Sequence, residues 1–114
     1  MARPDLNSAS FPTLHSGMGQ NSPGTVTGTN VKERDRVDIL GSGNKKWRGE
    51  VTSRASGNTW NATVSRVSGS SAATEKASRL TTGLSTQASE TVDVTVTNGD
   101  GSSDPVPTDS NVVP

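Results

Sequence analysis

Four adjacent residues combine positive charge with an aromatic ring, and they are the strongest candidate for a binding site in this sequence. They are Lys45, Lys46, Trp47 and Arg48. Such a grouping can stack on a sugar or a base, or hold an acidic neighbour. A second interpretation is a hairpin loop in which Trp47 folds back over the end of the domain. We favour this second interpretation, because the apolar body of a tryptophan usually finds cover.

Oxygen-bearing side chains alternate along a glycine-containing segment near the C-terminus. The residues are Asn98, Asp100, Ser102 and Asp104. Their spacing weakly resembles a calcium-binding loop, but the distal glutamate of such loops is missing. Asn-Gly and Asp-Gly are strong signals for a tight hairpin, and they need no ion. The segment therefore predicts a hairpin turn and not a metal site.

The residues that enzymes use for nucleophilic or metal chemistry are scarce in this chain. His15 is the single histidine, and there is no cysteine. No serine stands in a recognisable order with a histidine and an acid, and no phosphate-binding Gly-Lys-Ser or Gly-Lys-Thr is present. An Asn-Ala-Thr sequence at 61–63 matches a glycosylation acceptor, but it has no secretory route to use it. We therefore expect a protein that is not an enzyme and that has neither a cofactor nor a metal.

The composition limits both the fold and the partners. A chain of 114 residues has room for one domain. Only 27% of the residues are apolar, so we expect a thin core and a surface dominated by hydroxyl groups. The charged residues balance to a net charge of zero, which argues against nucleic acid as a partner. There is no apolar leader and no apolar run of about 18 residues, so we expect neither secretion nor a membrane partner.

Short runs rich in β-branched residues supply the elements that must position these side chains. They lie at 25–29, 36–40, 48–52, 59–64 and 91–97. In the last run, Val92, Val94 and Val96 alternate with polar residues, which is typical of a strand with one buried face. A further strand is expected around 105–107, where the prolines confine it to an edge. The pattern predicts an all-β fold.

The chain divides into an arm, a domain and a tail. We expect residues 1–22 to form an extended N-terminal arm, 23–108 a β-sandwich, and 109–114 a loose C-terminal tail. Leu6, Phe11 and Leu14 are the bulky anchors of the arm, and they are expected to bind a partner. The segment 71–80 has helical spacing behind a serine cap, so it is either one short helix or a loop.

Three stretches together resemble the IPT/TIG branch of immunoglobulin-like domains. They are 25–31, with its Gly-Thr-Asn turn, 37–41, which ends in glycine, and 92–103, a Val-Thr-Val-Thr-Asn strand that enters an Asp-Gly hairpin. The resemblance covers about 24–107. It departs from the family at Val31, where an aromatic residue is expected, and in the helical segment. It implies an immunoglobulin-like antiparallel β-sandwich.

The resemblance also implies a function, by analogy with small immunoglobulin-like accessory proteins of tailed bacteriophages. These proteins are parts of the virion, so we expect a capsid decoration or cement protein, made in the host cytoplasm and located in the virion. Its expected partners are the major capsid protein, another virion protein, or further copies of itself. The alternative is a tail, neck or fibre adhesion module that binds host-surface carbohydrate through Trp47.

Overall fold

The structure is a computed structural model, and it describes residues 2–68 and 88–113. The described chain is almost entirely β-structure, so the predicted all-β class is confirmed. The strands are β1 (Asp5–Ser10), β2 (Thr13–His15), β3 (Ser22–Thr29), β4 (Arg36–Leu40), β5 (Lys46–Ser56), β6 (Thr59–Ser68), β7 (Ala88–Asn98), β8 (Gly101–Ser102) and β9 (Val106–Val113), with one 3-10 turn at Ser42–Asn44. The predicted segment 71–80 lies outside the described residues.

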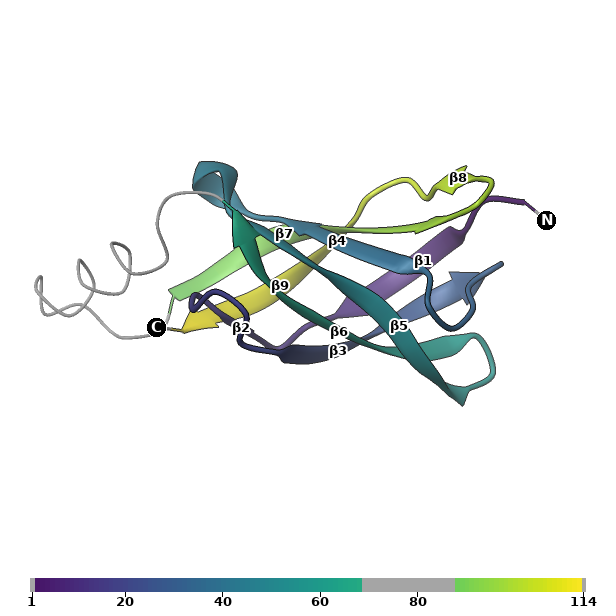
Figure 1. Cartoon of the computed structure of the whole chain (residues 1–114), viewed down its shortest axis with the longest axis horizontal. Coiled ribbons are helices and arrows are strands. Elements are labelled where there is room, and N and C mark those ends of the chain that lie inside the picture. The colour runs from purple at the N-terminus through teal and green to yellow at the C-terminus, as the bar shows by residue number, and fades with distance from the viewer. Residues whose placement is uncertain (1, 69–87, 114) are drawn as a thin grey trace, which may run out of the picture.

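The nine strands belong to one hydrogen-bonded sheet in the order β1-β3-β6-β5-β4-β7-β9-β2, with β8 paired to β7 (Figure 1). Every pair is antiparallel except β2 with β9, which is parallel. Strands β4 to β7 form a Greek key, because β7 returns to lie beside β4. The sheet curls until β1 lies near β9 at its other end. The result is a mixed, curled sheet in which no break in pairing separates two layers.

The core fills the inside of this curl. Its buried members are Leu6, Phe11, Leu14, Val26, Val31, Val37, Ile39, Trp47, Val51, Ala62, Val64, Val92, Val94, Val96 and Val112. The alternation predicted for 91–97 is confirmed, since its three valines are buried and the intervening side chains face outward. Alternation along 59–64 predicts that Trp60 faces inward with Ala62 and Val64. Trp60 is only half-buried, however, and packs at the edge of the core, with the guanidinium of Arg54 over its ring.

The N-terminal residues are not a separate arm. Strand β1 pairs with β3, and β2 pairs with β9, so this segment joins the two ends of the curled sheet. Leu6, Phe11 and Leu14 are buried in the core of their own chain, so the prediction that they bind a partner is wrong. The physical reason is the thin core itself. With so few apolar residues available, the domain needs these three to exclude water from its interior.

The expected loose tail at 109–114 is also wrong for the residues described. Strand β9 continues to Val113, and its residues pair with β7 on one side and β2 on the other. Val112 is fully buried between these neighbours. Pro105 immediately precedes β9 and Pro107 is its second residue, where the strand pairs with β7 alone, as predicted for an edge position.

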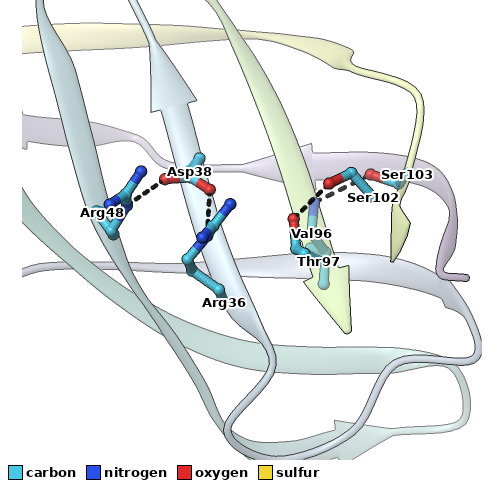
Figure 2. A network of polar contacts seen from close by, with 7 residues as sticks. All are labelled: Arg36, Asp38, Arg48, Val96, Thr97, Ser102 and Ser103. Carbon is cyan, nitrogen blue, oxygen red and sulfur yellow. Dashed lines mark hydrogen bonds and ion pairs between the residues drawn. The ribbon is translucent and has the colours of Figure 1, made fainter. Parts of the chain in front are cut away.

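The predicted hairpin near the C-terminus is confirmed. Asn98 pairs with Gly101 across a two-residue turn, and its side-chain oxygen accepts the N–H of Asp100 at 2.8 Å. Beyond the turn, the hydroxyl of Ser103 accepts the N–H of Val96 at 3.0 Å (Figure 2). These bonds hold the turn and the residue that follows β8 against β7.

Candidate functional site

Trp47 is buried, and its role is structural. Its side chain has no exposed surface, and its indole N–H donates to the carbonyl oxygen of His15 at 2.9 Å. The guanidinium of Arg66 lies 5.3 Å from the centre of its ring. The ring is therefore covered, as the favoured interpretation expects, but Trp47 lies within strand β5 and in the core, not in a hairpin loop at the end of the domain. An indole that is covered on all sides offers no face for a sugar ring to stack on.

Lys45 is also turned toward its own domain. Its ammonium group lies 2.7 Å from Oε1 of Glu90, and both side chains are largely buried. The other oxygen of Glu90 accepts the N–H and the hydroxyl of Ser42, each at 3.0 Å. Burial raises the pKa of Glu90, but the bonds from Lys45 and Ser42 and the charge of Lys45 outweigh it, so the pKa is lowered overall. The pair ties the start of β5 to β7.

Lys46 and Arg48 are the two members of the basic group that reach the outer surface. They alternate with buried Trp47 along β5, so both point away from the core. The Nε of Arg48 lies 2.6 Å from one oxygen of Asp38, and the Nε of Arg36 lies 2.8 Å from the other (Figure 2). Asp38 is thus held between two guanidinium groups on the outside of the sheet.

A half-open groove of about 600 Å³ lies on this outer surface. Strands β4 and β5 form its floor, and β6, β7 and Pro105 contribute to its sides. We call this surface the groove face, and its side chains are Asp38, Leu40, Lys46, Arg48, Val67, Asp93, Thr95 and Pro105. Leu40 and Val67 are 48% and 47% exposed, and both line this one groove.

The charges of the groove face are ordered by the sheet register. Leu40 pairs with Lys46 of β5 and with Asp93 of β7, so these three side chains form one row across three strands. Within 2–68 and 88–113, neither Lys46 nor Asp93 takes part in an ion pair. The row therefore consists of a negative, an apolar and a positive side chain, in the order Asp93, Leu40, Lys46. Its two charged side chains are free to form ion pairs with a partner.

The groove face only partly matches the site predicted from sequence. Of the seven predicted partner-binding residues, Lys46 and Arg48 line its surface, Trp47 lies beneath it, and the others are elsewhere. Leu40, Val67 and Asp93 were missed. Period-two alternation would have found Leu40, because Val37 and Ile39 in the same strand are buried and the residues between and after them must point outward.

Among the residues that the structure describes, no three His, Asp or Glu side chains are grouped so as to hold a metal ion. The same part of the chain has no helix long and apolar enough to cross a membrane. No protein-family model, curated protein or solved structure matches this chain.

Proposed function

We propose that this chain is a non-enzymatic structural protein of a virion, a capsid decoration or cement protein of a tailed bacteriophage, which attaches through its groove face. The observation that carries the proposal is the pair of exposed aliphatic side chains, Leu40 and Val67, set among charges in one groove. Exposed apolar surface rimmed by polar residues is typical of a protein-binding site. The location in a virion is proposed by analogy, from the resemblance to immunoglobulin-like accessory proteins of bacteriophages.

Attachment through the groove face differs physically from attachment through an arm. An arm that orders on binding loses conformational entropy at that step. The groove face lies on paired strands whose inward side chains fill the core, so it is already in place before contact. A preformed surface keeps more of its contact energy as affinity, which suits a small protein that seals joints on a particle.

The test is attachment to particles that lack the protein. The double variant Leu40→Ser with Val67→Ser removes the exposed aliphatic groups, and we expect binding to fall by about tenfold or more, since burial of each is worth about 1 kcal/mol or more. The thermal midpoint should hold, because both side chains are already about half exposed. Cosedimentation of labelled protein with purified particles measures the loss.

Met18→Ser is the matched control. Met18 is 56% exposed but lies outside the groove face, so its removal should leave attachment unchanged. If the Leu40 and Val67 double variant attaches as well as the unmodified protein, the groove face is not the attachment surface and the proposal fails.

A further inference from the structure

The row formed by Asp93, Leu40 and Lys46 carries charges of opposite sign on the two sides of β4. Leu40 lies on the central strand, a negative charge lies one strand away on β7, and a positive charge lies one strand away on β5. A two-fold axis parallel to β4 exchanges the β5 side of one copy with the β7 side of another. Such an axis places Lys46 of each copy opposite Asp93 of the second, and Leu40 opposite Leu40.

We infer that the groove face binds a second copy of this chain and that the protein forms a two-fold symmetric dimer. This inference rests on the proposed function in taking the groove face as the binding surface, and it names a second copy as the occupant in free solution. Because one face cannot hold both partners at once, the dimer must separate before either copy attaches to a particle. A symmetric dimer needs one patch that is complementary to itself. The row meets that need, because its two unpaired charges have opposite signs and flank an exposed aliphatic side chain.

The neighbouring row accommodates the same axis. Asp38 lies next to Leu40 on the outer side of β4, so in the dimer it faces its own symmetry mate. Like charges that face each other would oppose association. Here Arg36 and Arg48 bind both oxygens of Asp38 within the same copy, so the two carboxylates do not face each other uncompensated. The one positive charge left over in each cluster lies on arginine side chains that are about half exposed to solvent. The net charge of zero on the whole chain also means that two copies do not repel each other at long range.

A charge-exchange experiment on the purified protein tests the inference without any particle. Sedimentation equilibrium gives the dissociation constant of the unmodified protein and of three variants: Lys46→Glu, Asp93→Lys, and the two combined. Each single variant places like charges opposite one another twice per dimer, so we expect the dissociation constant to rise by about tenfold or more. The combined variant restores opposite charges, with the sides exchanged, and should return to near the original value.

Glu33→Lys is the control, since it makes the same charge change as Asp93→Lys at an exposed position outside the groove face. It should leave dimerisation unchanged. The inference is overturned if the unmodified protein stays monomeric up to millimolar concentration, if the single variants dimerise normally, or if the combined variant fails to recover. A protein that dimerises but does not attach to particles, even at concentrations below its dimer dissociation constant, would instead count against the proposed function alone.

Discussion

At the scale of single residues, the buried pair of Lys45 and Glu90 links stability to pH. The pKa of Glu90 lies below its usual value of 4.5: burial raises it, but the bonds from Lys45 and Ser42 and the charge of Lys45 lower it by more. A lowered pKa in the folded state means that the carboxylate stabilises the fold above pH 4.5. This stabilisation is lost as the pH falls through the folded-state pKa.

We therefore predict that Glu90→Gln lowers the free energy of unfolding at pH 7 and flattens its decline between about pH 5 and 3. Urea unfolding measured across this pH range gives the two curves. Asp35 provides a comparison of opposite sign, because burial raises its pKa above 3.8 despite the N–H and charge of Lys32. Its contribution is present below its usual pKa and is lost as the pH rises through the folded-state value, so Asp35→Asn should steepen the acid decline. Parallel curves for Glu90→Gln and the unmodified protein would contradict the role of the pair.

At the scale of elements, the segment from β1 to β2 is held in place by close contact with β3. Phe11 lies against Gly24, and a Cβ atom built on this glycine collides with the ring of Phe11 and the carbonyl oxygen of Ser10. The backbone of β3 must therefore lack a side chain here for the end of β1 and Phe11 to dock. Gly24 fixes how closely the N-terminal segment approaches the core.

We predict that Gly24→Ala destabilises the fold by about 2–4 kcal/mol, close to the loss caused by removing a buried phenylalanine, because the new methyl displaces Phe11. Thermal unfolding followed by circular dichroism measures the loss. Gly99→Ala is the matched control, since nothing lies within 4 Å of its Cβ position. A midpoint for Gly24→Ala equal to that of the control would show that Phe11 is not anchored as described.

The sequence predicted the strands of this fold better than their pairing. The run 91–97 is recognisable as a strand because valines alternate with polar residues, and β7 contains that run. Strand β1 gives no such signal, because a register shift between Leu6 and Ser8 changes which residues face inward. A bulge of this kind breaks period-two alternation, so the strand looks like irregular chain. The parallel pairing of β2 with β9 joins residues about as far apart as the chain allows, and no local pattern encodes it.

The groove face, too, could be predicted from the sequence only in its local features and not in the pairing that assembles it. The outward position of Leu40 follows from local alternation along β4. Its place between Asp93 and Lys46 depends on the return of β7 to the side of β4, which is a property of the Greek key and not of any one segment. The basic group at 45–48 is visible in the sequence. Which of its members are exposed depends on Trp47 facing the core, because its two neighbours in β5 must then face outward.

At the scale of the whole molecule, the N-terminal segment makes the domain one cooperative unit. It pairs with β3 through β1 and with β9 through β2, and the N–H of Asn111 donates to the carbonyl oxygen of Pro12 between these two strands at 2.9 Å. Releasing this segment would open the curled sheet at its closing point and expose the core that Phe11 and Leu14 complete. The segment therefore cannot leave while the rest of the domain keeps its stability.

We predict a single unfolding transition in urea, with coincident midpoints for far-ultraviolet circular dichroism and tryptophan fluorescence. The two signals report on different parts of the molecule, since circular dichroism follows all the strands, whereas the fluorescence comes from two tryptophans. Trp47 lies in the core and bonds to His15 at the end of β2, and Trp60 is half-buried in β6. If residues 5–15 were only loosely attached, loss of that bond would shift the fluorescence before the strands melted. A fluorescence midpoint clearly below the circular dichroism midpoint would therefore contradict the closing role of the N-terminal segment. At a protein concentration below the dimer dissociation constant, coincident midpoints that do not change with further dilution would assign the cooperativity to the single chain.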